Sequence, residues 1–218
     1  MNRLDELYDA RFDTAMRQRK LAMWAAIASY LSRYVAPDKP VLDLGCDEGY
    51  FIRNIRSSER WASDIRDMSS ALPSDIKFVQ SDGLQLRSVL PAAHFGTVFI
   101  SNYLEHLRSK EHVIEQLHVT YDLLAPGGRA IILQPNIRLT REAYWDFIDH
   151  HIALTEKSLV EAAELVGLRT VRVIKRFLPY TAKGKLPVDA RLVRLYLAFP
   201  PAWRLLGQQT LYVGERPA

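Results

Sequence analysis

Residues 41–51, V-L-D-L-G-C-D-E-G-Y-F, decide the fold class of this chain. The first four are a short apolar run, typical of a strand that is buried on both faces of a sheet. Gly45 and Gly49 then allow a sharp turn and let the backbone approach a ligand closely. The turn is not the G-x-G-x-x-G of a dinucleotide site, and it adds the carboxylates of Asp43 and Asp47. Because these would repel a pyrophosphate, the segment indicates a ligand with a cationic part.

Apolar runs with the spacing of strands alternate with stretches of helical period along the rest of the chain. We expect strands at residues 41–44, 60–63, 76–79, 97–100, 130–133, 170–177 and 210–213. We expect helices at 3–35, near 51–55, from Ser109 to the stop at 126–128, and from Thr155 to Gly167. This alternation predicts an α/β fold, a doubly wound Rossmann-like sheet with helices on both faces.

The length of 218 residues suits one domain, and no repeat or low-complexity linker divides it. Within the single domain, 1–218, we distinguish an N-terminal helical cap, a cofactor-binding core and a substrate-side half with an amphipathic insert. Their ranges are 1–38, 39–136, 137–218 and, for the insert, 186–207.

Cysteine content and hydropathy predict a cytoplasmic protein. The single cysteine, Cys46, excludes an internal disulfide framework and fits a reducing compartment. The first ten residues carry charges where a signal peptide needs an apolar core, and Leu21 to Leu31 is too short to span a bilayer.

The net charge of +4 is unevenly distributed. Residues 169–218 carry ten Lys and Arg against two acidic residues, which leaves a net −4 for the rest of the chain. A basic C-terminal quarter indicates a surface that meets an anionic partner, although a solvated basic face remains an alternative.

Acidic and polar residues follow the first four expected strands. In an open α/β sheet, ligands bind outside the carboxyl ends of the strands. Asp64 comes 21 residues after Asp43, where a carboxylate can accept hydrogen bonds from ribose hydroxyls, and Asp82 is placed to accept from an adenine amino group. Each alone has a plain reading as a turn or cap residue. Together they predict a nucleoside that is cationic and free of phosphate, such as S-adenosylmethionine.

With these residues in place, the chain resembles the class I S-adenosylmethionine-dependent methyltransferases, of the type 11/12-like group. The likeness lies in residues 41–51, in D-L-L-A-P-G-G-R-A-I-I-L at 122–133 and in S-N-Y-L-E-H-L at 101–107. It implies a seven-stranded sheet whose last strand is antiparallel, and S-adenosylmethionine as cofactor. The cofactor-binding residues it implies, with their neighbours, are Asp43, Gly45, Cys46, Gly49, Asp64, Ile65, Asp82, Gly83, Ser101 and Asn102.

Two further features qualify the resemblance. The middle glycine of the usual D-x-G-x-G-x-G is Asp47 here, and Asp is among the few residues that tolerate φ > 0. The tracts 144–180 and 195–207 are similar to bacterial methyltransferases found with polysaccharide and lipid-linked sugar synthesis. This implies O-methylation of a sugar, a glycolipid or another small acceptor.

A hydroxyl acceptor needs a base that titrates near neutrality. The candidates are His150 and His151, with Asp149 or Asp146 orienting the ring, and His106; the alternative is that these histidines only satisfy backbone groups.

The sequence supports a metal site less strongly than a histidine base. Glu105-His106 is similar to the E-x-x-E-H of some metal-dependent O-methyltransferases, but Asn102 replaces the first acid. We therefore expect no metal, with Glu105 and His106 at the start of the next helix, although the histidines nearby keep a divalent ion open.

Within the insert, Val188, Leu192, Leu195 and Phe199 form an apolar helical stripe opposite Arg191 and Arg194. Such a helix packs on its own domain, on a second subunit as a homodimer, or on the inner face of a membrane as a peripheral contact.

The rival functions are a nucleic-acid methyltransferase, which the S-N-Y-L sequence disfavours, a non-catalytic cofactor-binding protein and, last, a nicotinamide dehydrogenase.

Overall fold

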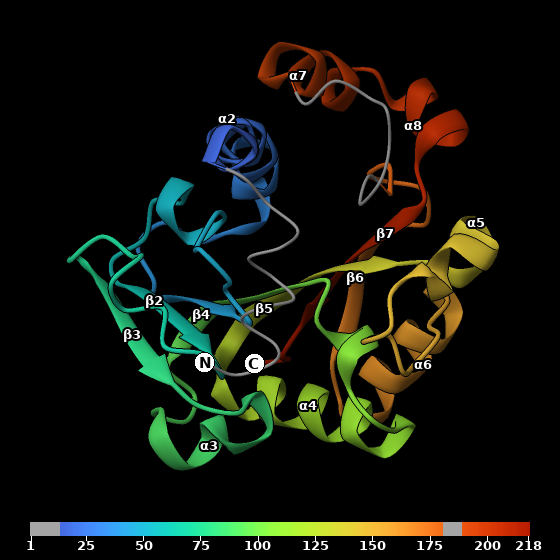
Figure 1. Cartoon of the computed structure of the whole chain (residues 1–218). Coiled ribbons are helices and arrows are strands. Elements are labelled where there is room, and N and C mark those ends of the chain that lie inside the picture. The colour runs from blue at the N-terminus through green and yellow to red at the C-terminus, as the bar shows by residue number, and fades with distance from the viewer. Residues whose placement is uncertain (1–13, 181–188) are drawn as a thin grey trace.

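The computed structural model describes residues 14–180 and 189–218. Its centre is a seven-stranded sheet in the order β3-β2-β1-β4-β5-β7-β6 (Figure 1). Strands β1 to β5 pair in parallel, and β7 lies antiparallel between β5 and β6. The expected Rossmann-like sheet with an antiparallel last strand is confirmed. The strands are β1 (Val41–Leu44), β2 (Arg60–Asp64), β3 (Ile76–Gln80), β4 (Phe95–Ser101), β5 (Leu124–Pro135), β6 (Arg169–Ile174) and β7 (Gln209–Glu215).

Helices cover both faces of the sheet, each over its own hydrophobic core. One face carries α2, α7 and α8, and the other carries α3, α4 and α6 (Figure 1). The central strands β1 and β4 are almost continuously buried, as their apolar sequences predict. The helices are α2 (Thr14–Leu31), α3 (Leu86–Val89), α4 (Lys110–Leu123), α5 (Ile137–Thr140), α6 (Glu156–Leu165), α7 (Ala190–Ala198) and α8 (Pro200–Leu206). Short 3-10 turns are η1 (Ser32–Tyr34), η2 (Ile52–Asn54), η3 (Gly83–Gln85), η4 (Leu104–His106) and η5 (Arg141–Asp146).

The expected helix near 51–55 is wrong: this segment forms only the single turn η2. Because β2 begins at Arg60, too little chain remains for a covering helix. The N-terminal helix α2 and the C-terminal helix α7 pack together over this face instead. Phe51 of the short turn stacks on Phe99 of β4 at 3.7 Å between ring centroids, which joins the turn to the core.

Helix boundaries follow the expected capping residues. Ser109 accepts a hydrogen bond from the His112 N–H at the start of α4, and Thr155 caps α6 in a capping box. Gly167 follows α6 with φ 93°, in the region that favours glycine. The expected N-terminal helix is observed from Thr14, and its portion at 3–13 lies outside the described residues. Strand β5 begins earlier than expected, at Leu124, so that the Pro-Gly-Gly segment already belongs to it.

The insert helix α7 turns its predicted apolar stripe outward, contrary to the simplest expectation. Leu192, Leu195 and Phe199 are 50%, 66% and 57% exposed, and Val188 lies outside the described residues. A second stripe, formed by Val193, Tyr196 and Leu197, packs on the core beneath α2 instead. Helix α7 therefore has apolar residues on two sides, of which the body of the protein covers one.

Trp203 of α8 anchors the insert to the body of the protein, and Trp203→Ala should destabilise the fold by about 3–5 kcal/mol, typical of a large aromatic removed from a core. Its ring packs against Tyr30 and Phe177 at centroid distances of 5.7 and 5.3 Å, and its indole N–H donates to the Tyr196 carbonyl. Urea unfolding measures the change. Leu205→Ala is the matched control on the same helix, because Leu205 is 82% exposed and should shift stability by less than about 0.5 kcal/mol. Equal effects of the two substitutions would contradict the observed packing of α8.

Candidate active site

The carboxyl ends of β1, β2 and β4 meet at one edge of the sheet. The parallel register pairs Leu44 with Ser63 on one side and with Ile100 on the other. Beyond the strand ends, the N–H groups of Gly45 and Cys46 both donate to the Ser63 carbonyl at 2.9 Å. The turns that carry the expected cofactor residues are therefore joined to one another by backbone hydrogen bonds.

The glycine turn after β1 adopts the conformation that its sequence requires. Gly45, Asp47 and Gly49 have φ of 68°, 49° and 69°, all in the left-handed region. The expectation that Asp47 tolerates φ > 0 at the position of the missing glycine is confirmed. Buried Asp43 accepts a hydrogen bond from the Ile52 N–H at 3.2 Å and so fixes the far end of the turn. Burial raises the pKa of Asp43 well above its usual value, a shift that this hydrogen bond opposes.

Asp64, at the end of β2, already accepts four hydrogen bonds from the chain. One carboxylate oxygen accepts from the Asp47 N–H at 3.0 Å and from Nη2 of Arg66 at 3.4 Å. The other accepts from the backbone N–H and the Nε of Arg66 at 3.0 and 3.2 Å. Arg66 also bridges to Asp47 at 2.9 Å. This arginine was not predicted from the sequence, although its spacing of two residues from Asp64 was a usable signal. A ligand hydroxyl that bonds to the Asp64 carboxylate would share it with Arg66, because a carboxylate has about four lone-pair sites.

Tyr103 is a second residue that the sequence analysis missed. Its ring lies against Gly45, so closely that a Cβ there would be 2.8 Å from the tyrosine Cδ2. Its hydroxyl donates to the Gln116 side chain at 3.0 Å and lies 2.3 Å from the position a Cβ would take on Gly83. Tyr103 thus bridges the turns after β1 and β3, and both glycines are needed because this ring occupies the space beside them.

The remaining expected cofactor residues lie on the same edge in different settings. Asp82 caps η3 by accepting from the Leu84 N–H at 3.0 Å, so its plain role as a cap residue is observed. Ile65, directly after β2, is 58% exposed, and Cys46 is buried. Asn102 has φ 47° and is tied to β5 through its N–H, which donates to the Leu133 carbonyl.

The side chains at this edge fit S-adenosylmethionine and do not fit a pyrophosphate. The turn that would meet the ligand contains two glycines and the carboxylates of Asp43 and Asp47, and Asp64 follows on the next strand. Only Arg66 among the described contacts of these carboxylates brings a compensating positive charge. A sulfonium and an ammonium are attracted by such a donor set, whereas phosphate oxygens are repelled.

This sheet order and this acidic edge define a class I S-adenosylmethionine-dependent methyltransferase. A family model described as a methyltransferase domain matches residues 15–173, and the chain belongs to this family. S-adenosylmethionine is accordingly its cofactor. The sequence matches no curated protein.

Solved structures share the fold at low sequence identity. A SAM-dependent methyltransferase from Archaeoglobus fulgidus is 21% identical, with a TM-score of 0.65 over 87% of this chain and 92% of that one. An S-adenosylmethionine-dependent methyltransferase from Mesorhizobium loti is 19% identical, with a TM-score of 0.62 over 89% and 98%. The N-methyltransferase NodS from Bradyrhizobium japonicum, solved with S-adenosylhomocysteine, is 15% identical, with a TM-score of 0.61 over 94% and 89%.

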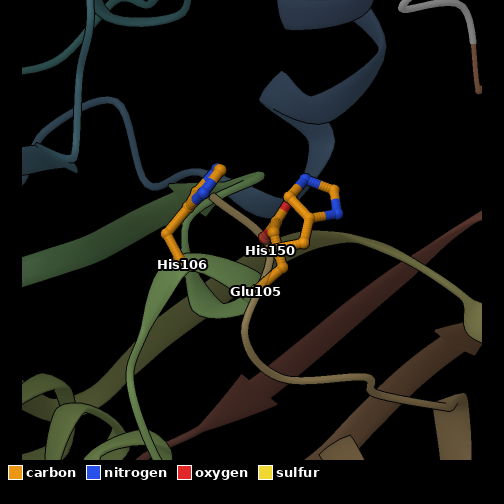
Figure 2. Close-up of side chains that lie close together, drawn as sticks. All are labelled: Glu105, His106 and His150. Atoms are coloured by element: carbon orange, nitrogen blue, oxygen red, sulfur yellow. The ribbon is translucent and has the colours of Figure 1, made fainter. Parts of the chain in front are cut away.

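Glu105, His106 and His150 come together beside this edge (Figure 2). Glu105 and His106 lie in η4, the turn that begins directly after Tyr103, and His150 lies in the loop that follows η5. The N–H groups of His151 and Ile152 donate to the Glu105 carbonyl at 2.8 and 3.2 Å, which fixes this loop to η4. The structure therefore brings together two of the three expected catalytic histidines, while the side chain of His151 is exposed.

The orientation of the imidazoles differs from the expected one. We expected Asp149 or Asp146 to orient His150, but His150 Nδ1 lies 2.7 Å from the Tyr144 carbonyl, and the ring stacks on Phe147. Asp149 orients His106 instead, since its carbonyl is 2.9 Å from His106 Nδ1. The expected capping of the next helix by Glu105 and His106 is also wrong, because Ser109 caps α4.

An open cavity of about 530 Å³ lies between α5, η5 and α8. Tyr180 in its wall packs against Phe147 at 6.0 Å between ring centroids, and Phe147 in turn stacks on His150. Arg138, Arg141 and Arg176 line the cavity, together with Leu205 and Leu206. Three guanidinium groups beside exposed leucines suit a ligand that has both an anionic and an apolar part.

Proposed function

We propose that this enzyme transfers the methyl group of S-adenosylmethionine to a hydroxyl oxygen of a small amphiphilic acceptor, a sugar or glycolipid that carries an anionic group. The observation that supports this proposal most directly is that a pair of histidine rings is connected by aromatic side chains to a cavity lined by arginines. His106 and His150 pack edge to face at 5.1 Å between ring centroids, and the rings of Phe147 and Tyr180 lie between His150 and the cavity.

The cofactor-binding role falls to the turns after β1 to β4. Asp43, Gly45 and Gly49 would hold the methionine part, Asp64 the ribose and Asp82 the adenine, with Ile65 covering the base. We assign four further residues to the cofactor site because they lie in or beside the same turns: Cys46, Gly83, Ser101 and Asn102. Bound there, S-adenosylmethionine supplies an electrophilic methyl group.

The histidine cluster would prepare the acceptor. A hydroxyl is a poor nucleophile until its proton leaves, and a positioned group that withdraws this proton accelerates the reaction by roughly 10²–10⁴. A carbonyl oxygen only accepts hydrogen bonds, so His106 and His150 each donate an N–H from Nδ1, and Nε2 is the ring nitrogen that would face the acceptor hydroxyl. We place the activation of the hydroxyl with these two residues, and not with the exposed His151.

Three acceptors of graded chemistry test the proposal. Tag-free enzyme is incubated with isotope-labelled S-adenosylmethionine and a lipid-linked sugar phosphate, the same glycolipid without phosphate, or a short RNA. We expect label on a sugar oxygen of the first acceptor, found by mass spectrometry, and slower transfer to the second. Arg176→Ala should reduce the difference between the transfer rates to the phosphorylated and the phosphate-free glycolipid, because it removes one guanidinium group of the cavity. Label on RNA alone would replace the proposal by the nucleic-acid alternative.

The exposed stripe of the insert would hold the enzyme against an anionic membrane that contains such an acceptor. Leu195, Leu205 and Phe199 are more than half exposed, and the exposed Arg191, Arg194 and Arg204 accompany them. Arginines near an anionic surface each contribute about 1 kcal/mol of attraction. None of the helices in the described part of the chain is long and apolar enough to cross a bilayer.

Co-sedimentation with phosphatidylglycerol vesicles checks this surface. The double substitution Leu195→Asp and Leu205→Asp should weaken binding by about tenfold or more, since burying one leucine contributes about 1.5–3 kcal/mol. Val89→Asp is the control, because Val89 is 54% exposed on α3, across the sheet from α7. Binding that is absent in the unmodified protein, or equal in both variants, would contradict the membrane contact.

A further inference from the structure

The side chains of Glu105, His106 and His150 lie close together in a single cluster (Figure 2). One candidate ligand atom of each residue lies within 4.8 Å of those of the other two. Two histidines and one carboxylate are a recurrent ligand set for divalent transition metals, which bind imidazole nitrogen and carboxylate oxygen at about 2.0–2.2 Å. In a tetrahedral site, ligand atoms at these bond lengths are about 3.3–3.6 Å apart. Binding of an ion would therefore draw the three side chains closer by up to about 1.5 Å.

Glu105 is the buried carboxyl of the cluster. It is 1% exposed, and burial raises its pKa, a shift that the neighbouring Gln134 amide and His106 oppose. Its Oε2 makes no hydrogen bond of normal geometry within the described residues. A buried carboxylate without a partner is costly, and buried charges are normally paired or bound to metal. His106 Nδ1 is committed to the Asp149 carbonyl, so it does not satisfy this oxygen.

The two histidines are oriented as metal ligands usually are. A ligating histidine donates its second ring N–H to a carbonyl or carboxylate, which fixes the ring and leaves the other nitrogen to the metal. Both imidazoles make this bond through Nδ1, to the carbonyls of Asp149 and Tyr144, at 2.9 and 2.7 Å. The two carbonyls belong to η5 and to the loop that follows it, and this loop is itself fixed to the backbone of Glu105. The ligands are thus pre-oriented by backbone groups and not by flexible side chains.

We propose that Glu105, His106 and His150 bind one divalent transition-metal ion, with Zn²⁺ as the representative ion. Three protein ligands leave a coordination position for water or for an acceptor oxygen. An oxygen bound there loses its proton more readily, so the ion would carry out the activation of the hydroxyl. This role rests on the proposed function, but the binding of the ion does not.

Metal binding is measured first, without reference to activity. Tag-free protein is treated with EDTA, dialysed and titrated with Zn²⁺ by calorimetry, and with Co²⁺ by visible absorption, which reports nitrogen and oxygen ligands. We expect one ion per chain. His106→Ala, His150→Ala and Glu105→Gln should each weaken binding at least 100-fold, whereas His118→Ala, which removes a 56% exposed histidine on α4, should leave it unchanged.

Glu105→Gln keeps the shape of the side chain, and its melting temperature is measured beside the metal titration to separate unfolding from ligand loss. Folded Glu105→Gln that binds Zn²⁺ like the unmodified protein would overturn the proposal, as would the absence of stoichiometric binding below about 100 μM. Methyl transfer by the EDTA-treated enzyme at full rate, with one Zn²⁺ bound in the titration, would keep the site and reject only its role in activation.

Discussion

Asp64→Ala should raise the dissociation constant for S-adenosylhomocysteine by about two orders of magnitude. Hydrogen bonds to a charged group contribute about 1.5–3 kcal/mol, and the substitution removes the only carboxylate at the end of β2. It also removes the acceptor of the Asp47 N–H, which fixes the glycine turn to the next strand. Calorimetric titration measures the change directly, and it needs no acceptor.

Two further variants make this result specific. Asp67→Ala removes a carboxylate three positions later that lies on the surface and bonds only within its own turn, and it should leave the affinity unchanged. Asp64→Asn keeps an acceptor for the Asp47 N–H but loses the charge. Its affinity for S-adenosylhomocysteine should therefore lie between those of Asp64→Ala and Asp67→Ala. Equal affinities in Asp64→Ala and Asp67→Ala would remove Asp64 from the cofactor site.

His106→Ala should lower kcat for methyl transfer by about 10²–10⁴ and leave the dissociation constant for S-adenosylhomocysteine unchanged. The imidazole belongs to the cluster on the acceptor side, and the glycine turn and Asp64 do not depend on it for any described hydrogen bond. His150→Gln, which retains a hydrogen-bonding group at the buried position, should have a similar effect.

Single-turnover rates with saturating cofactor measure this loss, and His118→Ala serves as the control because its side chain is 56% exposed on α4. A loss of cofactor affinity in His106→Ala would mean that η4 supports the cofactor turn rather than the acceptor. Unchanged turnover in both His106→Ala and His150→Gln would mean that neither histidine activates the acceptor. Catalysis would then come only from holding the acceptor and the methyl group in contact.

The parts of the site that depend on local chemistry could be predicted from the sequence. Asp47 illustrates this: the family pattern calls for a residue with φ > 0, aspartate tolerates it, and the structure has φ 49° there. The positions of the strands follow from equally local patterns, because an apolar run such as 41–44 is typical of a strand that is buried on both faces. The seven-stranded sheet with its antiparallel last strand is implied by the family resemblance and not by these patterns.

Contacts between segments far apart in the chain could not be predicted in this way. His150 is oriented by the Tyr144 carbonyl and not by an aspartate, because the path of the loop after η5 decides which backbone group faces the ring. The ring of Tyr103 packs on Gly45 only because β1 and β4 are neighbours in the sheet.

The insert shows a different limit. Its helical period is correct, but α7 carries two apolar stripes, and periodicity alone does not say which of them the body covers. Packing against α2 buries the stripe of Val193 and Leu197 and leaves Leu195 outside. The sequence pattern thus predicts the amphipathic helix correctly and leaves its orientation open.

Calorimetric titration of the unmodified protein with S-adenosylhomocysteine, and separately with NADH, examines the acidic edge of the sheet as a whole. Carboxylates at Asp43, Asp47 and Asp64 should give one S-adenosylhomocysteine per chain, bound at micromolar concentration, and no heat with NADH. Tight binding of NADH without any heat from S-adenosylhomocysteine would mean that this edge accepts a pyrophosphate, and the assignment of the cofactor site would be wrong.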